Sequence, residues 1–394
     1  MNLILFDDPS IRQDLSPFTF TRPISEMRVG ILTITEKWEK HLSTKASFYT
    51  AEYLSEKYPG KSTNDNLFVN GAICPNDSLV KIIEKLKEEE AISKNGILIA
   101  ARTKSTSFDN VKVIAYEGEI ILIDQLWKIF QYNGDQIKLD FDLLTHGRKS
   151  NEFNDTHTIL YGQLGKDIFI EEGAIIKAAV LNAENGPIYI GKNTQVQEGA
   201  LIRGPFALCE GSHVNMGAKI RGDSTVGPYS KVGGEISNSV IFGFSNKGHD
   251  GFLGNSVIGE WCNLGADTNT SNLKNNYENI KIWNYKKEGF KDTGLQFCGL
   301  IMGDHSKCGI NTMFNTGTVV GIGCNIFGDG FPRTFIPSFS WGGAAGFTTF
   351  QLNKMLDTAG KVFERRGRIL EAFDKEILQH LFESTAVNRV WEKR

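Results

Sequence analysis

Aliphatic residues recur at every sixth position through much of the second half of the chain. The longest unbroken series comprises Ile190, Val196, Ile202, Leu208, Val214, Ile220, Val226 and Val232. A residue that is usually small follows each of them four positions later, as at Thr194, Ala200 and Ser212. An α-helix repeats near 3.6 residues and a β-strand at two, so neither accounts for this period. It is typical of a solenoid in which each hexad forms one side of a triangular coil, with the aliphatic residue inside.

The hexad series breaks and resumes along the chain. An earlier pair is Ile170 and Ile176, and later series comprise Phe252, Ile258 and Leu264, then Met302, Cys308, Phe314, Val320 and Ile326, with Gly330 at the last small position. We expect Phe252 to point inward, and Cys262, Cys308 and Cys324 to be small core residues rather than ligands. The breaks lie over 237–251 and 270–298. Loops on a rigid scaffold often carry function, so these are the candidate functional loops.

The flanking segments show ordinary helix and strand patterns. Strands are expected over 67–70, 96–101 and 111–116 and helices over 29–42 and 77–93, which together indicate an open α/β sheet. After the hexads, helices are expected over 349–363 and 368–383. The predicted organisation is an α/β domain over 1–145, a linker over 146–166, a β-helix over 167–340, and a strap with helices over 341–394.

Composition and charge exclude several classes of protein. The 394 residues are 40% apolar and 23% charged, and 43 basic against 46 acidic residues give a net charge of −3. This balance argues against a nucleic-acid partner, which requires an excess of positive charge. No apolar run approaches the ~20 residues of a membrane span and the first residues lack a basic leader, so we expect a cytoplasmic protein without a membrane partner. The six cysteines form no CxxC pair, and we expect no metal site from them.

One break in the hexads carries a specific motif. Residues 248–268 are GHDGFLGNSVIGEWCNLGADT. This stretch resembles the element G-H-x-x-[YF]-x-G-[DN]-x-x-I-G-x-x-x-N-[IL]-G-A-x-T of the bifunctional glucosamine-1-phosphate N-acetyltransferase/N-acetylglucosamine-1-phosphate uridyltransferase family. The resemblance implies an α/β N-terminal nucleotidyltransferase-like (Rossmann-like) domain and a C-terminal left-handed parallel β-helix of hexapeptide repeats with terminal helices.

The resemblance also implies a site on the β-helix. His249 matches the family's general base, and acyl transfer from a thioester to an amine benefits from a base that titrates near neutrality. Arg221 resembles the arginine that holds the sugar phosphate, and Asn272 resembles the asparagine that contacts the sugar, with Lys274 at a nearby basic position. Ala266 matches the small residue beside the acetyl-CoA thioester. Each also has a purely structural interpretation: a turn-capping histidine, solvated polar side chains and a packed alanine.

The N-terminal segment resembles the sugar nucleotidyltransferases more loosely. Within residues 10–27, Arg12 falls into the family's opening motif and is a candidate substrate-binding residue. The glycine-rich loop that cradles a nucleoside triphosphate is replaced by FDDPS. In the segment VNGAICP, Ala72 stands where the family's aspartate binds Mg²⁺. Mg²⁺ is therefore a cofactor only if Asp7 or Asp8, which otherwise simply end a strand, supplies the missing carboxylate.

Three functions follow from these residues and resemblances. The first is an enzyme of nucleotide-sugar biosynthesis that transfers an acyl group from acetyl-CoA to an amino-sugar-1-phosphate or a nucleotide-sugar, with His249 as general base. The second is a sugar-1-phosphate nucleotidyltransferase that uses UTP or dTTP, with the β-helix as an oligomerising scaffold. The third is a non-catalytic protein that senses nucleotide-sugars. Because the family builds its acetyl-CoA site between subunits, the resemblance implies a homotrimer.

Overall fold

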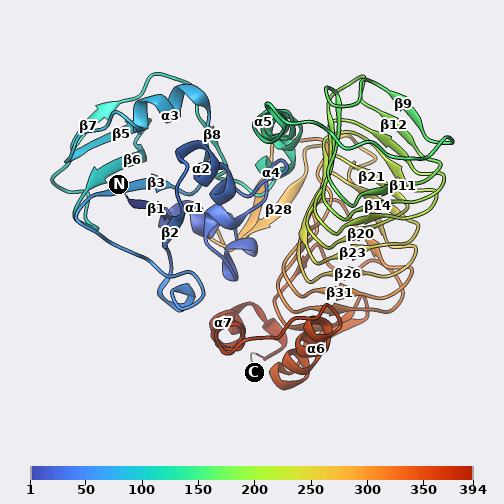
Figure 1. Ribbon diagram of the computed structural model, residues 1–394. Coiled ribbons are helices and arrows are strands. Elements are labelled where there is room, and N and C mark those ends of the chain that lie inside the picture. The colour runs from blue at the N-terminus through green and yellow to red at the C-terminus, as the bar shows by residue number, and fades with distance from the viewer. Residues whose placement is uncertain (1, 393–394) are drawn as a thin grey trace. The chain divides into compact units, whose positions relative to one another are not determined.

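The computed structural model describes residues 2–392. The chain divides into two compact units, of which unit 1 comprises Met1–Met27 and Leu32–Gln125 and unit 2 comprises Arg28–Ile31 and Leu126–Arg394. One unit holds an α/β sheet and the other a parallel β-helix, so the predicted fold class is confirmed (Figure 1). Within residues 2–392, none of the helices combines the length and the apolar character of a membrane-crossing segment.

Unit 1 is a mixed sheet with three α-helices. Its strands are β1 (Asn2–Phe6), β2 (Ala46–Tyr49), β3 (Asn66–Asn70), β4 (Ile73–Cys74), β5 (Glu90–Lys94), β6 (Ile97–Thr103), β7 (Lys112–Ala115) and β8 (Ile121–Leu122), and its α-helices are α1 (Pro9–Asp14), α2 (Ile34–Leu42) and α3 (Asp77–Ile83). Six of the strands pair in the order β2-β1-β3-β6-β5-β7. β1 runs parallel to β2 and β3, whereas β6 is antiparallel to β3 and β5. The central strands β1 and β3 are almost entirely buried, as their apolar runs require.

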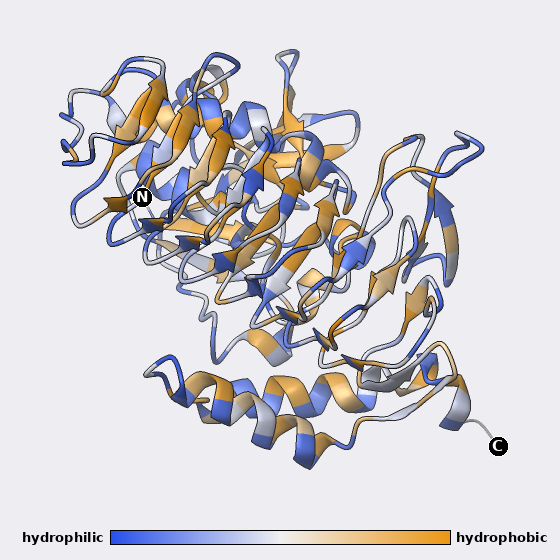
Figure 2. Ribbon diagram, turned by 90° about the vertical axis from the view of Figure 1, so that its right-hand side faces the viewer, coloured by the Kyte–Doolittle hydropathy of each residue, from blue (hydrophilic) through white to orange (hydrophobic). Residues whose placement is uncertain are grey.

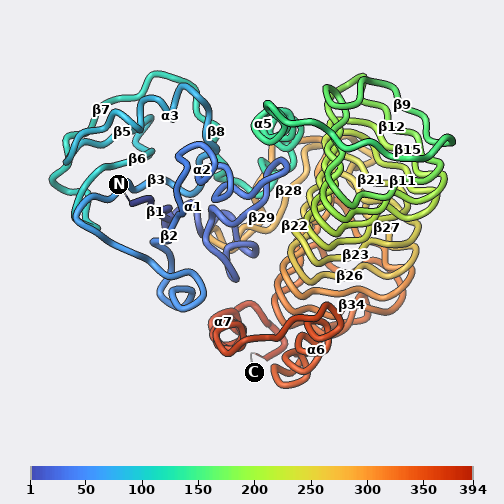
Figure 3. The backbone as a smooth tube through the Cα atoms, in the orientation of Figure 1, coloured from blue at the N-terminus to red at the C-terminus, as the bar shows by residue number. Residues whose placement is uncertain are grey.

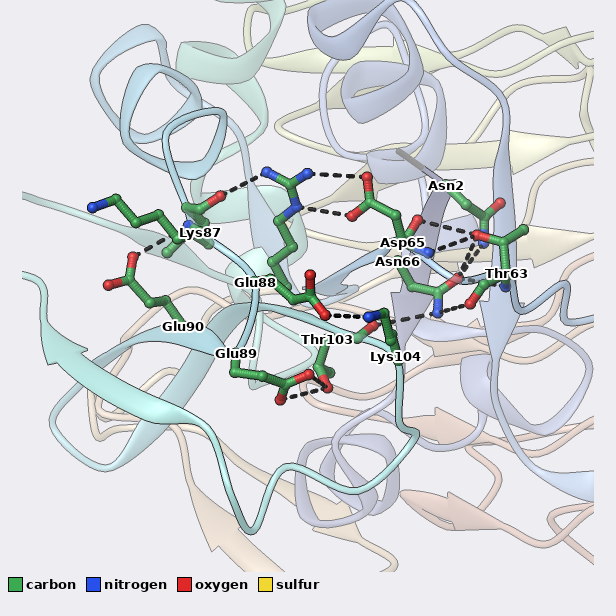
Figure 4. A network of polar contacts seen from close by, with 12 residues as sticks. Asn2, Thr63, Asp65, Asn66, Lys87, Glu88, Glu89, Glu90, Thr103 and Lys104 are labelled. Atoms are coloured by element: carbon green, nitrogen blue, oxygen red, sulfur yellow. Dashed lines mark hydrogen bonds and ion pairs between the residues drawn. The ribbon is translucent and has the colours of Figure 1, made fainter.

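A network of polar side chains ties neighbouring strands of this sheet together (Figure 4). The guanidinium of Arg102 binds the carboxylate of Asp65 through two bonds of 2.8 and 3.0 Å. The carboxylate of Glu89 accepts a hydrogen bond from the hydroxyl of Thr103 at 2.9 Å. The ion pair between Arg102 and Asp65 is half-exposed, so it fixes geometry more than it adds to the free energy of unfolding.

Two helices of unit 1 differ from the expectation. The helix predicted over 29–42 begins only after Thr33, because the Thr33 and Glu36 side chains form a reciprocal capping box. The helix predicted over 77–93 ends at Ile83, and the following residues enter β5, which pairs with β6 and β7. Backbone pairing across the sheet therefore overrode the helical spacing of that segment.

Unit 2 is dominated by a β-helix of three parallel sheets, whose coils stack on one another (Figures 1 and 3). The first sheet contains β10 (Ile168–Ile170), β13 (Ile188–Ile190), β16 (Phe206–Leu208), β19 (Ser224–Val226), β22 (Val240–Gly243), β25 (Val257–Glu260), β30 (Ile301–Met302), β33 (Val319–Val320) and β35 (Phe335–Ile336). The second sheet contains β11 (Ile175–Ile176), β14 (Gln195–Val196), β17 (His213–Val214), β20 (Lys231–Val232), β23 (Asn246–Lys247), β26 (Asn263–Leu264), β31 (Lys307–Cys308), β34 (Asn325–Ile326), β36 (Ser340–Gly343) and the antiparallel β37 (Gly346–Thr349). The third sheet contains β9 (Ile159–Tyr161), β12 (Val180–Asn182), β15 (Leu201–Arg203), β18 (Lys219–Ile220), β21 (Glu235–Ser237) and β24 (Phe252–Gly254). Two smaller pairs are β27 (Asn269–Thr270) with β32 (Met313–Phe314), and the hairpin of β28 (Lys281–Asn284) and β29 (Gly289–Asp292).

The hexad residues fill the interior of the β-helix, with two exceptions. Cys262, Cys308 and Cys324 are buried among them, as predicted. Phe252 does not point inward as predicted: Leu253 pairs with the inward Ile236 and is fully buried, whereas Phe252 is half-buried. Gly330 is exposed rather than inward, because the hexads have ended and the chain loops out before β35. Residues 146–166, predicted as a linker, contain β9, which pairs with β12 and extends the third sheet.

Helices cover parts of the β-helix. α4 (Lys128–Gln131) and α5 (Asn133–Thr145) fall in unit 2, although the sequence placed them in the α/β domain. α6 (Leu352–Glu364) and α7 (Ala372–Ser384) lie close to their predicted bounds. Apolar and polar residues alternate along both helices (Figure 2). The ring of Phe363 on α6 stacks on Trp261 with centroids 3.9 Å apart, and Trp261 stacks on Phe244 at 4.3 Å. This aromatic stack anchors α6 to the coils.

Candidate active site on the β-helix

A shortened corner interrupts the regular surface of the β-helix. Between the second and third sheets, successive inward residues are usually six positions apart, but Val232 and Ile236 are only four apart. The corner between them consists of Gly233 and Gly234. A Cβ atom on Gly233 would lie 2.5 Å from the carbonyl oxygen of Gly248 on the next coil. The close approach of the two backbones therefore requires glycine.

A cavity of about 750 Å³ lies at this corner. Its lining includes His213, Lys231, His249, Asp250, Ala266 and Asp267. Two of the predicted site residues, His249 and Ala266, thus share one cavity, on turns of neighbouring coils. The His249 side chain is exposed, and Ala266 is half-buried. An imidazole that reaches solvent beside a small side chain is an arrangement that leaves room for reactants.

The backbone of the turn of residues 248–251 is held in place through its carbonyl groups. All four carbonyl oxygens accept a hydrogen bond. The bonds are Asn215 Nδ2 to Gly248 O (2.7 Å), Lys247 Nζ to His249 O (2.6 Å) and Asp250 O (2.8 Å), and the Glu235 amide to Gly251 O (3.1 Å). Burial lowers the pKa of Lys247 to about 8. The position of the His249 backbone is thus defined by the coil beneath it.

His213 also lines the His249 cavity, although the sequence did not predict it as a site residue. Its ring is half-buried, and burial lowers its pKa, with the positive charges of Lys231 and Arg366 acting in the same direction. The ring is therefore neutral near pH 7. A signal for it existed in the sequence: His213 and Lys231 are 18 residues apart, one coil of three hexads, and each precedes an inward valine. Residues with that spacing stack on the same outer face of the coil.

A second cavity, of about 510 Å³, adjoins the first, since Lys231 lines both. Its lining includes the cations Lys231, Lys307, Arg365 and Arg366 and the aromatic rings of Phe244 and Trp261. Of the described residues that line it, none carries a carboxylate. Burial lowers the pKa of Lys307, whose ammonium donates to the carbonyl oxygen of His305 at 3.0 Å. Such a concentration of positive charge suits an anionic ligand.

The three other predicted residues of the β-helix lie outside these cavities. Arg221 lines a third cavity of about 760 Å³, where its guanidinium pairs with Glu235 at 3.0 Å and its side chain is 69% exposed. The Asn272 amide donates to the Asn255 side chain at 2.8 Å. The Lys274 ammonium donates to the carbonyl oxygen of Asn279 at 3.3 Å. Within one chain, the structure does not bring these residues to His249.

In unit 1, the side chains of Arg12, Asp7 and Asp8 make hydrogen bonds to nearby residues of the same unit. The guanidinium of Arg12 pairs with Asp7 at 2.6 Å and donates to the hydroxyl of Tyr53 at 3.0 Å. Asp7 also accepts from the Thr50 hydroxyl at 2.5 Å, and burial raises its pKa despite the adjacent arginine. The Asp8 carboxylate caps α1 by accepting hydrogen bonds from two backbone amides.

These contacts decide how well a magnesium ion fits unit 1. Ala72 is fully buried and has no ligating atom in its side chain, both carboxylate oxygens of Asp7 accept hydrogen bonds, and Oδ1 of Asp8 caps α1. Among residues 2–392, no group of three or more histidine, cysteine, aspartate or glutamate side chains could hold a metal ion. The donor set therefore does not fit the magnesium site that the nucleotidyltransferase resemblance implies.

Known proteins match both parts of the chain. The family model described as sugar nucleotidyl transferase matches residues 3–149. The bifunctional protein GlmU of Methanococcus aeolicus is 28% identical over 261 residues, which cover 62% of this chain and 59% of that relative. The GlmU of Methanocaldococcus jannaschii is 36% identical over 90 residues, covering 23% of this chain and 21% of the relative. This chain is similar to the bifunctional GlmU proteins over part of its length. The resemblance predicted from residues 248–268 is thereby confirmed.

Other matches point to acetyltransferases. The putative uncharacterized acetyltransferase YaiX of Escherichia coli (strain K12) is 27% identical over 148 residues, covering 37% of this chain and 64% of that one. The chain thus spans less than two thirds of the length of each of these three relatives. A solved structure of Arabidopsis UDP-N-acetylglucosamine acyltransferase is 14% identical and covers 60% of this chain and 93% of that chain, with a TM-score of 0.23. That score is too low to bear on function.

Proposed function

We propose that this protein is a transferase of nucleotide-sugar biosynthesis. It moves the acetyl group of acetyl-CoA to the amino group of an amino-sugar-1-phosphate or a nucleotide-sugar. The observation that carries the proposal is the cavity at the Gly233–Gly234 corner, into which His249 projects beside Ala266. The relation to the GlmU proteins and to the acetyltransferase YaiX supports it.

The chemistry assigns a role to each cavity residue. The amine attacks the thioester carbonyl, so an N–C bond forms and the C–S bond breaks. The proton lost from the amine passes to the His249 imidazole, and the departing thiolate is protonated in turn. The carboxylates of Asp250 and Asp267 line the same cavity and attract an incoming ammonium group, which loses one proton to solvent before the free amine attacks. Ala266 leaves the thioester room to approach.

The second cavity suits the phosphorylated part of acetyl-CoA. Lys231 joins it to the His249 cavity, so a single extended ligand can occupy both. The cations Lys307, Arg365 and Arg366 would neutralise phosphate groups. The residues present therefore fit the phosphate groups of this co-substrate.

The acceptor side of the proposal requires more than one chain. Arg221, Asn272 and Lys274, the residues proposed to bind the sugar phosphate, lie outside the His249 cavity of their own subunit. We therefore propose a homotrimer in which a neighbouring β-helix presents these residues to the cavity. A closed cyclic assembly makes every such interface equivalent.

The test of this function is the replacement His249→Ala. Acetyl transfer to the best amino-sugar acceptor should fall by ~10²–10⁴-fold, the usual contribution of a general base. The matched control is His157→Ala, which removes an exposed histidine outside the cavity and should leave turnover unchanged. Full turnover in His249→Ala would refute the mechanism.

A second candidate function is sugar nucleotidyl transfer, which the family match over residues 3–149 favours. Its test is Mg²⁺-dependent release of pyrophosphate from UTP or dTTP in the presence of a hexose-1-phosphate. Because Asp7, Asp8 and Ala72 do not fit a magnesium site, we rank this activity second. If nucleotide-sugars bind but neither assay shows turnover, the protein is a sensor rather than an enzyme.

A further inference from the structure

One inward position of the β-helix holds a charged side chain, whereas the equivalent positions on neighbouring coils hold apolar ones. The inward positions of the second sheet form a column that runs along the axis of the prism. Its members are Ile176, Val196, Val214, Val232, Lys247, Leu264, Cys308 and Ile326. Seven of the eight are apolar side chains, and the eighth, Lys247, is only 1% exposed. A charged group in such a column is costly unless specific bonds compensate it.

The hydrogen bonds that compensate it come from the turn that carries His249. The Lys247 ammonium donates to the carbonyl oxygens of His249 and Asp250 at 2.6 and 2.8 Å. Two successive carbonyls are thereby held toward the interior, which turns the two side chains outward into the cavity. Ammonium-to-carbonyl bonds are stronger than bonds between neutral groups, and they are shielded from water here.

The other two carbonyls of the turn are held by groups that any residue at position 247 would leave in place. Asn215 binds the carbonyl of Gly248 at 2.7 Å, and the Glu235 amide binds that of Gly251 at 3.1 Å. These contacts fix the ends of the turn, whereas Lys247 fixes its middle. The middle is where the His249 side chain departs from the backbone.

We infer that Lys247 is a positioning residue, whose buried ammonium sets the direction in which the His249 imidazole enters the cavity. The inference rests on the proposed function, in which that imidazole is the base. Lys247 itself touches no substrate, since its side chain lies inside the prism. Burial lowers the pKa of Lys247 to about 8, and the negative charges of Asp250, Cys308 and Asp267 act in the opposite direction.

The test uses the full chain and the variant Lys247→Met, which keeps the length of the side chain and removes its donors. Loss of positioning lowers kcat by about 10- to 100-fold while the KM values for both substrates stay within about twofold, because the binding groups are elsewhere. The matched control is Leu264→Met, a volume-conserving change at the next position of the same column. This control should retain wild-type kcat.

A double-mutant cycle separates positioning from general damage to the fold. In the His249→Ala background, Lys247→Met should cause no further loss of acetyl transfer, because there is no imidazole left to orient. An equal loss in both backgrounds, or a folded Lys247→Met enzyme with wild-type kcat, would overturn the inference. Should Lys247→Met not fold, Lys247→Leu, which also lacks a donor and matches the leucine of the next coil, takes its place in the same cycle.

A crystal structure of Lys247→Met gives a readout that does not depend on activity. The inference expects the turn 248–251 to be displaced while Val232 and Leu264 keep their places; an unmoved turn contradicts it. If His249→Ala itself retains wild-type acetyl transfer, the proposed function fails. In that case the crystal structure still decides whether Lys247 holds the turn.

Discussion

At the scale of single residues, this protein places ionisable groups where burial changes their chemistry. Lys247 lies in an apolar column, His213 is half-buried in the cavity, and the thiols of the β-helix are sealed in its core. Burial lowers the pKa of the two bases and raises the pKa of buried thiols such as Cys298, by the same cost of charging a group away from water. The side chain of His249, by contrast, is exposed.

The first prediction concerns the pH dependence of stability. Burial lowers the pKa of Lys247 from 10.5 to about 8, so between these values the unfolded chain binds more protons than the folded one. The free energy of unfolding should therefore rise with pH in this window, by about 3 kcal/mol at most. The facing groups that share this titration are the carboxylates of Asp250 and Asp267 and the thiol of Cys308. Urea unfolding of wild type and Lys247→Met from pH 7.5 to 10.5 measures it, and parallel stability curves would contradict it.

The second prediction concerns the cysteines. All six are free and buried, and burial raises the pKa of Cys298 to about 12 and that of Cys324 to about 11. The thiolate is the reactive form, so native protein should react with none of its thiols when treated with a disulfide reagent at pH 8. All six should react after unfolding in guanidinium chloride. Rapid labelling of one or more thiols in the native protein would count against the buried core.

At the scale of elements, the cavity arises from a local change in an otherwise regular repeat. The corner at Gly233 and Gly234 is two residues shorter than the usual one, and the turn 248–251 packs directly against it. The hexads on either side continue to fill the interior. A solenoid tolerates such a change because each coil contacts only its neighbours.

The third prediction compares two glycines. In Gly233→Ala, the new Cβ would meet the carbonyl oxygen of Gly248 at 2.5 Å, so the turn that carries His249 must shift. Acetyl transfer should fall by up to ~10²-fold, with a stability cost of about 1–3 kcal/mol. The matched control is Gly360→Ala on α6, where a Cβ meets nothing within 4 Å. That change should raise the free energy of unfolding by about 0.5–1 kcal/mol and leave turnover unchanged. Equal activity in the two variants would refute the role of the corner.

At the scale of the whole molecule, the chain combines a unit related to sugar nucleotidyl transferases with a β-helix that carries the candidate acyltransferase site. Neither unit by itself contains all the residues proposed for acetyl transfer in one cavity. The residues proposed for the sugar phosphate are on the same β-helix as His249 but line other surfaces. Assembly is the simplest way to bring them together.

The fourth prediction tests that assembly by complementation. If Arg221 and His249 of one site come from different subunits, co-expression of His249→Ala with Arg221→Ala should restore about a quarter of wild-type acetyl transfer, because a quarter of the interfaces are intact. Co-expression of His249→Ala with Lys247→Met is the control, since both defects lie on the same side of the interface and little is restored. Absence of restoration, or a single-chain mass in solution, would refute the shared site.

The hexad period by itself determined the β-helix, its inward residues and its buried cysteines, because a coil that must fill its own interior repeats in sequence as it repeats in space. The motif over 248–268 likewise singled out His249 and Ala266, which line one cavity. The tertiary structure decided what depends on register between coils: Leu253 rather than Phe252 faces inward, and residues 90–94 form a strand. The location of the Lys247 side chain also depends on tertiary structure, since only the stacking of coils shows that this lysine occupies a core position beneath the turn. The spacing of inward residues within a coil can be read from the sequence, whereas the register between distant strands is determined by tertiary packing.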